Sequence, residues 1–394
     1  MLNDHHIGII KSTIPLLESA GPSLTKHFYE RMFSHNPELK DIFNMSHQQT
    51  GRQSIALFEA IAAYAKNIDN LAVLTSAVER IAHKHTSFNI QPDHYQIVGL
   101  HLIETLRELA SEAFTSEVEE AWTAAYLFLA QVFISREGEL YLQRKQALGG
   151  WENAREFIVQ EKVKESELVT SFIFAPTDKE SVLDYQAGQY IGIEVKPESS
   201  QYKEIRQYSL SQKSNGKNYR ISVKREGFDT QHAGIVSNYL HDELCVGDCV
   251  KLYAPAGDFF YVEREAPVVL ISAGIGATPM QAMLQHFAQV KKRDVTYLHA
   301  CNSPEQHSFI SDTAKLIEAN DWKQKVWYLN SDSSVEGNGH MQLDKVQLPL
   351  PLHNGDFYVC GPIGFMQFIV EQLESLGVDK SRIHYEVFGP HANL

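Results

Sequence analysis

The chain has 394 residues, more than one ordinary hydrophobic core organises, so we expect two or three domains. Hydrophobic residues make up 43% and charged residues 21%, which is typical of a globular protein. The formal net charge of -14 argues against nucleic acid or an anionic membrane surface as the main partner.

The cysteines and the N-terminal segment restrict the class of protein further. No CxxC pair occurs among Cys245, Cys249, Cys301 and Cys360, so we expect buried free thiols rather than a disulfide framework or a cysteine metal site. The N-terminal segment carries an acid and two histidines early and lacks the apolar core of a signal peptide. No apolar run is long enough to span a bilayer. We therefore expect a cytoplasmic protein.

The chain divides into three stretches of different pattern. Residues 1–148 are predicted to be all helical, because apolar residues recur three and four apart, and Gly149-Gly150 ends a last helix that starts near residue 116. The runs FIVQEKV, QYIGIEV and YRISVKR predict an antiparallel β-barrel over 151–261. Over 262–394, the runs VVLISAG, VTYLHAC, VWYLN and DFYVCGP alternate with helical segments. They predict an α/β domain whose parallel strands are buried on both faces.

One histidine continues the apolar stripe of a helix in the first stretch. The stripe has steps of three, four and three and consists of Leu71, Leu74, Val78 and Ile81. The next step of four reaches His85, whereas His83 lies about 200 degrees around the helix and is expected to face water. His85 is therefore either a buried histidine with a hydrogen-bond partner or an axial haem ligand, since neutral imidazole binds iron.

Other polar groups are also predicted to face inwards. The stripe of a neighbouring helix is Gln53, Leu57, Ala60 and Tyr64. Its first member is polar, and a buried amide needs a partner such as a ligand. Tyr29 is an inward candidate beside Phe28 and Phe33, although aromatic residues at this spacing are usually plain core.

The last helix of this stretch carries an acidic residue on its apolar face. Its stripe of Tyr126, Leu129 and Phe133 continues to Glu137. A carboxylate on an apolar stripe is costly unless it is paired. Glu137 therefore either meets water at the domain edge or has a partner inside.

Two motifs stand out in the later stretches. The tetrad on a predicted barrel strand is Arg206, Gln207, Tyr208 and Ser209, and it resembles the FAD signature of the ferredoxin-reductase-like superfamily. The chemistry agrees with what this resemblance implies, because arginine can pair with phosphate, tyrosine can pack on a flavin and serine can hydrogen-bond its ring, while the alternative is an exposed polar strand. The second motif follows the strand VVLISA and opens a helix, as a pyrophosphate-binding turn does; it comprises Gly274, Ile275, Gly276, Ala277, Thr278 and Pro279. Its final proline departs from the Rossmann GxGxxG pattern.

The first stretch resembles the globin domain of bacterial flavohaemoglobins in HFYERMFSHNPELKDIFNMS, QSIALFEAIAAYAKNI and KHTSF, and the resemblance extends over essentially the whole chain. It implies that His85 is the proximal ligand of the haem iron. It also implies that Tyr29, Gln53 and Leu57 line the distal pocket and that Phe43 packs against the haem. Glu137 and Tyr95 match residues that lie beside the proximal histidine in the family.

The second half resembles the ferredoxin-reductase-like superfamily in its RxYS and GxGxxP motifs. Tyr190 and Ser237, the latter in the turn 234–238, match flavin and phosphate positions of that superfamily. A second nucleotide-side motif is Cys360, Gly361 and Pro362. The C-terminal segment implied to pack by the flavin contains Glu386, Phe388, Gly389 and Pro390.

The resemblance implies a nitric oxide dioxygenase that detoxifies nitric oxide. Electrons would pass from NADH or NADPH through FAD to haem b, where O2 and NO become nitrate, with no obligate protein partner. Two alternatives stay open: an oxygen-storing or oxygen-sensing globin, and a general reductase in which the globin is secondary. NADH is the expected donor, because the segment after VTYLHA offers no Arg or Lys to a 2′-phosphate and carries Glu305, although Ser303 could still bind it.

Overall fold

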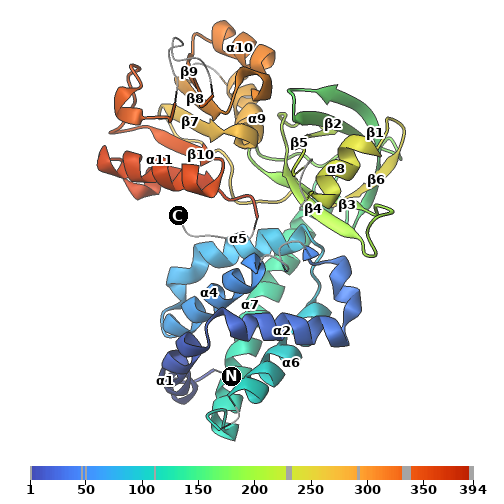
Figure 1. The fold of residues 1–394 in the computed structure, drawn as a ribbon, viewed down its shortest axis with the longest axis vertical. Coiled ribbons are helices and arrows are strands. Elements are labelled where there is room, and N and C mark those ends of the chain that lie inside the picture. The colour runs from blue at the N-terminus through green and yellow to red at the C-terminus, as the bar shows by residue number, and fades with distance from the viewer. Residues whose placement is uncertain are drawn as a thin grey trace. The chain divides into compact units, whose positions relative to one another are not determined.

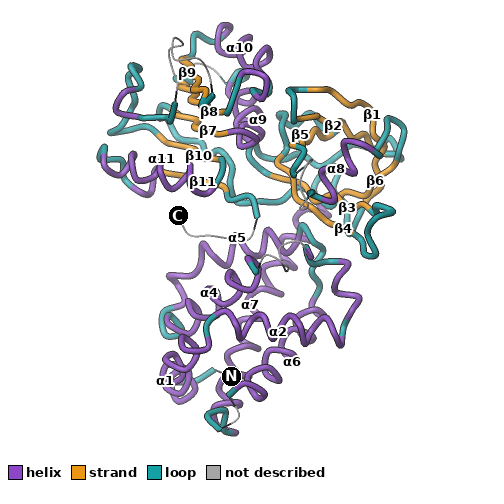
Figure 2. The backbone as a smooth tube through the Cα atoms, in the orientation of Figure 1, coloured by secondary structure: helices purple, strands orange, loops and turns teal. Residues whose placement is uncertain are grey.

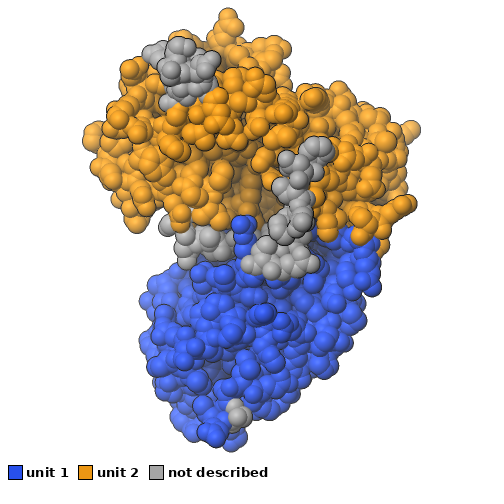
Figure 3. Space-filling view, viewed as in Figure 1, with its two compact units in different colours: residues 1–147, 200–206 blue, residues 148–199, 207–394 orange. Residues whose placement is uncertain are grey.

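A computed structural model of the chain describes residues 2–45, 48, 51–110, 112–227, 233–290, 293–330 and 339–389. The chain forms two compact units, coloured separately in Figure 3. The first contains residues 1–147 and 200–206, and the second contains residues 148–199 and 207–394. Helices dominate the first unit and strands gather in the second (Figure 2).

The first unit is built from α-helices joined by short 3-10 turns (Figure 1). Its elements are α1 (Asp4–Ala20), α2 (Pro22–His35), η1 (Pro37–Asp41), α4 (Arg52–Lys66), η2 (Leu71–Leu74), α5 (Thr75–Thr86), α6 (Pro92–Leu109) and α7 (Ser116–Gln146). Helix α6 begins at the predicted proline, with Gln91 and His94 forming a reciprocal capping box. Helix α7 ends two residues earlier than predicted, because Ala147 already has extended backbone angles.

The core of the first unit lies where α2, α4, α6 and α7 meet. Its most buried large side chains include Phe28, Met32 and Trp122. Helices α6 and α7 approach closely at Gly99, where a Cβ atom would overlap the ring of Tyr126. A glycine at this place in α6 therefore allows the α7 side chains to reach the residues that α6 carries.

After the helices, the chain forms a six-stranded sheet in the order β4-β3-β6-β1-β2-β5, which belongs to the second unit except for residues 204–206 of β4. Its strands are β1 (Arg155–Lys164), β2 (Val169–Pro176), β3 (Tyr190–Val195), β4 (Glu204–Ser209), β5 (Tyr219–Lys224) and β6 (Cys249–Leu252). The pairings of β1 with β2 and β6, of β2 with β5 and of β3 with β6 are antiparallel. One short helix, α8 (Ile235–Asp242), accompanies this sheet and buries Val236 and Leu240 in its core.

The rest of the second unit is a parallel sheet in the order β11-β10-β7-β8-β9, with helices on both faces (Figure 1). The strands are β7 (Val268–Ala273), β8 (Val295–Cys301), β9 (Lys323–Tyr328), β10 (Asp356–Cys360) and β11 (Ile383–Glu386). Helices α9 (Ala277–Phe287) and α10 (Ile310–Ala319) pack on one face, and α11 (Ile363–Ser375) packs on the other. The fold thus confirms the predicted order of a helical globin, an antiparallel sheet domain and a parallel α/β domain.

Several details of the prediction were wrong or incomplete. Strand β9 is only half-buried, because it is the edge strand and lacks a neighbour on one side. The edge strand β11 was not predicted; it is four residues long and too short to show a pattern. Cys301 and Cys360 are buried, but Cys245 and Cys249 are exposed, because both lie at the turn that leads into β6.

No helix in the described ranges has the length and apolar character needed to cross a membrane.

Two neutral histidines lie buried in the parallel sheet domain. The His299 Nδ1 atom lies 2.8 Å from the Ser272 hydroxyl, and the His307 Nδ1 atom lies 2.9 Å from the Tyr328 hydroxyl. The two imidazole rings stack with their centroids 4.8 Å apart. Burial lowers the pKa of His299 to about 3 and that of His307 to about 4. Both rings are therefore uncharged in the folded protein at neutral pH.

From this buried histidine pair we predict that the second unit becomes less stable to unfolding in acid. The unfolded histidines have a pKa of about 6.5 and bind protons that the folded ones do not, so the free energy of unfolding should fall as pH drops from about 6.5 towards 4. The slope should reach at most about 1.4 kcal/mol per pH unit for each histidine. Denaturant unfolding at a series of pH values measures it. His299→Asn and His307→Asn should flatten the dependence, whereas the exposed His340→Asn should not; equal slopes in all four proteins would contradict the prediction.

Candidate functional site

The centre of the first unit holds a buried carboxylate with two partners. Glu137 lies on the inner face of α7 with only 3% of its surface exposed. Its Oε1 atom lies 2.8 Å from the His85 Nδ1 atom of α5 and accepts a hydrogen bond of 2.5 Å from the Tyr95 hydroxyl of α6. The structure therefore places Glu137 inside the domain rather than at a solvated edge, and it supplies the pairing that a buried carboxylate needs.

The hydrogen-bonding roles in this cluster follow from the charge of Glu137. Burial, and then the negative charge of Glu137, raise the pKa of Tyr95 well above its ordinary value. Tyr95 is therefore a neutral donor, and Glu137 accepts from both Tyr95 and the Nδ1–H group of His85. Every hydrogen bond that the His85 side chain makes to described residues uses Nδ1. The lone pair on Nε2 is thus available, and 34% of the side chain is exposed. This donor set fits an axial ligand to haem iron.

Aromatic side chains enclose the cluster. The ring of Phe133 lies 5.7 Å from the ring of His85 and stacks on the ring of Tyr95 at 6.3 Å. The Tyr126 hydroxyl donates to the carbonyl oxygen of Tyr95 at 2.5 Å. The predicted inward stripe of α7 therefore surrounds the three polar residues with apolar surface and holds the backbone of one of them.

The expectation that His83 faces water was wrong. His83 is only 9% exposed, and its Nε2 and Nδ1 atoms lie 3.1 Å from Glu79 and 3.3 Å from Arg144. The Arg144 guanidinium also donates to the Thr86 hydroxyl at 2.6 Å. The end of α7 packs against this second face of α5, so both faces of the helix are covered. His83 is thus more buried than His85, and the two histidines differ in their partners: His83 meets Glu79 and Arg144, whereas His85 meets Tyr95 and Glu137.

A second polar group surrounds Tyr29 in the same unit. Burial raises the pKa of its hydroxyl, which shares hydrogen bonds with Gln53 and Gln48 and stays protonated. The ring of Phe43 lies 5.9 Å from the Tyr29 ring in an edge-on arrangement. Leu57 packs against the same core. The structure thus brings Tyr29, Gln53 and Phe43 together, and Leu57 packs against the same hydrophobic core.

Two features of this group were not anticipated. Gln48 joins it from outside any predicted stripe and, like Gln53, hydrogen-bonds to the Tyr29 hydroxyl. Ala60, expected on the inner stripe of α4, is exposed, because the buried face of α4 runs through Ser54, Tyr64 and Ala65 instead.

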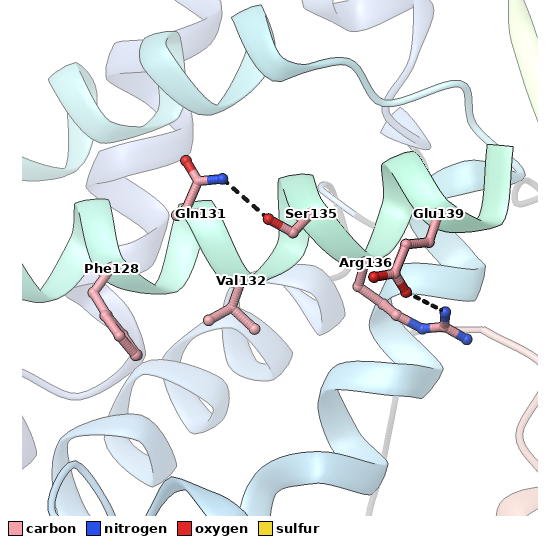
Figure 4. Close-up of a pocket in the computed structure, with 6 residues that line it drawn as sticks. All are labelled: Phe128, Gln131, Val132, Ser135, Arg136 and Glu139. Atoms are coloured by element: carbon pink, nitrogen blue, oxygen red, sulfur yellow. Dashed lines mark hydrogen bonds and ion pairs between the residues drawn. The ribbon is translucent and has the colours of Figure 1, made fainter. Parts of the chain in front are cut away.

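A surface pocket on α7 is separate from these groups (Figure 4). It is lined by Phe128, Gln131, Val132, Ser135, Arg136 and Glu139. These positions lie on the face of the helix opposite Glu137. An Arg136–Glu139 ion pair of 2.8 Å closes one end.

The predicted flavin motif occupies β4. Ser209 is buried, and Tyr208 is half-buried against the core of the sheet. The Arg206 guanidinium lies 2.9 Å from the Glu204 carboxylate, a partner that the sequence did not suggest. Gln207 is half-buried on the same strand.

Two further residues that the resemblance assigns to flavin or phosphate lie on other elements. Tyr190 is buried at the start of β3, with its ring against Gly257. Ser237 lies in the first turn of α8, where its hydroxyl oxygen accepts from the Glu226 backbone N–H at 3.2 Å.

The two nucleotide motifs meet at the carboxyl edge of the parallel sheet. Gly274, Ile275 and Gly276 form a 3-10 turn, η3, between β7 and α9. A Cβ atom on Gly276 would overlap the backbone carbonyl of Cys360, so no other residue fits there. This close approach leaves a bare backbone turn at a helix start, which fits a pyrophosphate.

The first turn of α9 continues the motif with Ala277, Thr278 and Pro279, all of them buried. The Thr278 hydroxyl donates to the Ile275 carbonyl at 2.9 Å and so holds the turn closed.

The second motif leads into the C-terminal segment. Cys360 ends β10 and pairs with Glu386 at the end of β11, while Gly361 and Pro362 lead into α11. Phe388 is 43% exposed, and Gly389 follows with a φ of 126°. Pro390 lies outside the described residues.

Comparisons with known proteins match this arrangement. The family described as globin matches residues 26–133, the oxidoreductase FAD-binding domain matches 156–261, and the oxidoreductase NAD-binding domain matches 270–371. A flavohemoprotein from Vibrio cholerae serotype O1 is 71% identical over 394 residues. The match covers 100% of this chain and 100% of that protein. The chain belongs to the flavohaemoglobin family. It is therefore an oxidoreductase with a globin, an FAD-binding and an NAD-binding domain.

Solved structures of flavohaemoglobins and their parts agree with this membership. A flavohemoglobin from Malassezia yamatoensis with bound FAD and heme has a TM-score of 0.87 at 27% identity, with 98% of this chain and 100% of that chain covered. The FAD/NAD-binding domain of a nitric oxide dioxygenase from Vibrio cholerae O1 biovar El Tor is 62% identical, with a TM-score of 0.58. The match covers 61% of this chain and 100% of that one.

Proposed function

We propose that this flavohaemoglobin is a nitric oxide dioxygenase that converts NO and O2 to nitrate and so detoxifies nitric oxide. Haem b would be held in a globin domain over 1–148, FAD in a barrel domain over 151–261, and NADH or NADPH in a domain over 262–394. The proposal is supported by the name of the Vibrio cholerae reductase domain and by the bound FAD and heme of the Malassezia yamatoensis protein.

The buried contact between His85 and Glu137 is the observation that carries the proposal. A carboxylate that accepts the Nδ1–H bond makes the imidazole a more electron-rich ligand through Nε2. Haem iron, when bound there, supplies the redox chemistry. Tyr95 donates to the same carboxylate oxygen and holds it in place. A globin that only stores oxygen has no need of an electron-rich proximal ligand, so this contact favours oxygen activation.

On the other side, Tyr29 and Gln53 would act on the small ligands. The raised pKa of Tyr29 keeps its hydroxyl protonated, so it can donate a hydrogen bond to a polar diatomic ligand. Gln53 shares a hydrogen bond with Tyr29 and would orient it. Phe43 packs its ring against Tyr29 and would exclude water from the site.

The reductase half would position its two cofactors through backbone and side-chain groups. The bare turn at Gly274–Gly276 presents N–H groups to a pyrophosphate. Ser209 and Tyr208 would contact the flavin ring, while Arg206 would pair with its phosphate. Because the reductase and the globin share one chain, no separate reductase partner is required. A cytoplasmic location stays a prediction.

Purified protein given NADH, O2 and NO tests the function directly. We expect catalytic nitrate formation, and we expect His85→Ala to lose haem and nitrate formation while keeping flavin reduction by NADH. His83→Ala should lower stability and keep haem, because its partners are Glu79 and Arg144. Slow turnover with tight O2 retention would instead identify an oxygen store or sensor. Reductase activity that is indifferent to haem loss, without nitrate formation, would identify a general reductase.

The role of the buried carboxylate predicts a specific phenotype. Glu137→Gln and Tyr95→Phe should retain haem and FAD but lose nitric oxide dioxygenase turnover. Glu137→Gln should also lower the Fe–His stretching frequency. A neutral amide is a weaker acceptor for the Nδ1–H group than a carboxylate, so the imidazole becomes a less electron-rich ligand. Resonance Raman spectra and nitrate assays on the same samples measure both effects. An unchanged frequency together with unchanged nitrate production would remove Glu137 from the mechanism.

The choice of nicotinamide is proposed to be NADH. In the loop after β8, the Ser303 hydroxyl hydrogen-bonds to the Glu305 carboxylate, and this bond holds the pKa of Glu305 below its usual range. The hydroxyl is therefore already engaged, and the carboxylate carries a negative charge that would repel a 2′-phosphate.

This loop predicts how the preference can be reversed. Glu305→Gln should raise kcat/KM for NADPH more than for NADH, and Glu305→Arg should raise it further, because repulsion becomes attraction. Steady-state kinetics with both nucleotides measure the ratio. Glu318→Gln, an exposed substitution on α10, is the matched control. A wild-type kcat/KM that is higher for NADPH, or a ratio unmoved by Glu305→Arg, would count against the assignment.

A further inference from the structure

One arginine of the barrel contacts both halves of the reductase unit. Arg220 lies on β5, and its Nη2 and Nε atoms donate to the carbonyl and hydroxyl oxygens of Ser211 at 2.7 and 3.2 Å. Ser211 follows Ser209 of the flavin motif by two residues. The guanidinium is therefore attached to the segment that carries the predicted flavin contacts.

The same guanidinium also contacts the nucleotide-binding domain. Its carbon atom lies 5.3 Å from the ring centroid of Phe309, which caps the start of α10. Phe309 is 3% exposed and has a φ of 63°, in the left-handed region that a residue with a Cβ atom adopts at a cost. Such a conformation persists where surrounding contacts hold it. The stacked arginine is one of these contacts.

Backbone and hydroxyl contacts accompany this cation–π pair. The N–H of Glu167 donates to the carbonyl of Glu305 at 2.8 Å, and the Ser308 hydroxyl donates to Ser166 at 3.0 Å. These bonds join the β1–β2 turn of the barrel to the loop 302–309. This is the loop that carries Ser303 and Glu305, the residues proposed to select the nicotinamide.

Both domains also help to balance the buried charge. Burial lowers the pKa of Arg220, and the carboxylates of Glu165 in the barrel and Asp312 on α10 oppose that effect. On the barrel side, a chain of hydroxyl contacts of 2.6 to 2.7 Å runs from Glu165 to Ser211 through Ser171 and Ser222. Arg220 thus joins the end of this buried polar chain and also contacts the Phe309 ring.

We propose that Arg220, stacked on Phe309, is a positioning residue that sets the distance between the flavin segment and the nucleotide loop. The inference rests on the proposed function, since it assumes FAD beside Ser209 and a nicotinamide nucleotide beside residues 302–309.

Hydride transfer breaks a C–H bond of the nicotinamide with its electron pair and forms an N–H bond on the flavin. The nicotinamide is oxidised, and the flavin is reduced with uptake of one proton. Such transfer needs reacting atoms about 3 to 3.5 Å apart, and a shift of about 1 Å costs about 100-fold in rate.

The experiment compares full-length holoproteins carrying Arg220→Gln, Arg220→Lys and Phe309→Leu. Amide hydrogen exchange of residues 302–313 reports the docking of the loop without any turnover. Anaerobic stopped-flow reduction of FAD by NADH separates the rate constant for hydride transfer from the NADH dissociation constant.

We expect amide hydrogen exchange of residues 302–313 to rise about tenfold or more in Arg220→Gln. The hydride-transfer rate constant should fall about tenfold or more, while FAD content and NADH affinity change by no more than about twofold. Arg220→Lys, which keeps the charge but loses the planar fork, should lie between Arg220→Gln and the wild type.

The matched control is Arg155→Gln in the same barrel. Arg155 also lies over aromatic rings, those of Trp151 and Phe157, and pairs with Asp178. All of these partners belong to the barrel, so its loss should leave exchange in 302–313 and the hydride-transfer rate constant unchanged.

The measurements on Arg220→Gln and Arg155→Gln either support or overturn the positioning role of Arg220. Wild-type exchange and wild-type rate in Arg220→Gln, or an equal loss in Arg155→Gln, would overturn the positioning role. If Arg220→Gln does not fold, Phe309→Leu provides the same comparison. A wild-type protein that binds FAD and is reduced by NADH but forms no nitrate would refute the dioxygenase proposal and leave this one intact. A wild-type protein whose flavin NADH does not reduce would overturn both.

Discussion

A charged carboxylate inside a helical core has to be compensated, and this constraint organises the globin unit. Glu137 is almost fully buried, so the free energy of its desolvation is offset by hydrogen bonds from His85 and Tyr95. Those partners come from α5 and α6, and the third helix, α7, supplies the carboxylate itself. These two contacts hold the three helices in register and orient the imidazole with Nδ1 towards the carboxylate. Structure and proposed chemistry therefore depend on one buried charge.

The reductase unit follows a different constraint, the geometry of parallel strands. The carboxyl ends of β7, β10 and β11 lie next to one another because the sheet order is β11-β10-β7. The two nucleotide motifs are thereby brought together although Gly276 and Cys360 are 84 residues apart, and Gly276 is packed against the carbonyl of Cys360 with no room for a side chain. The functional residues lie at this edge because loops that follow parallel strands converge there.

Local pattern placed some residues correctly and misplaced others on both the inner and the outer faces of helices. The stripe through Ile81 predicted that His85 alone faces the core; its Nδ1 atom does face the buried Glu137, but His85 is half-buried whereas His83 is buried. The polar residues Gln53 and Glu137 on predicted apolar faces both have partners. His83 and Ala60 were misplaced because a stripe describes one face of one helix. Whether the opposite face is covered depends on where another helix packs, and α7 covers the second face of α5.

The sequence by itself determined the three-part architecture, the motifs RQYS and GIGATP, and membership in the flavohaemoglobin family, since periodicity and short motifs are local properties of the chain. Only the tertiary structure decided which side chains pair. The partners of Glu137 are 52 and 42 residues away, and Arg220 meets a phenylalanine 89 residues further along the chain. Such pairings depend on how helices and strands pack in space, because contact is set by distances between atoms and not by separation along the chain.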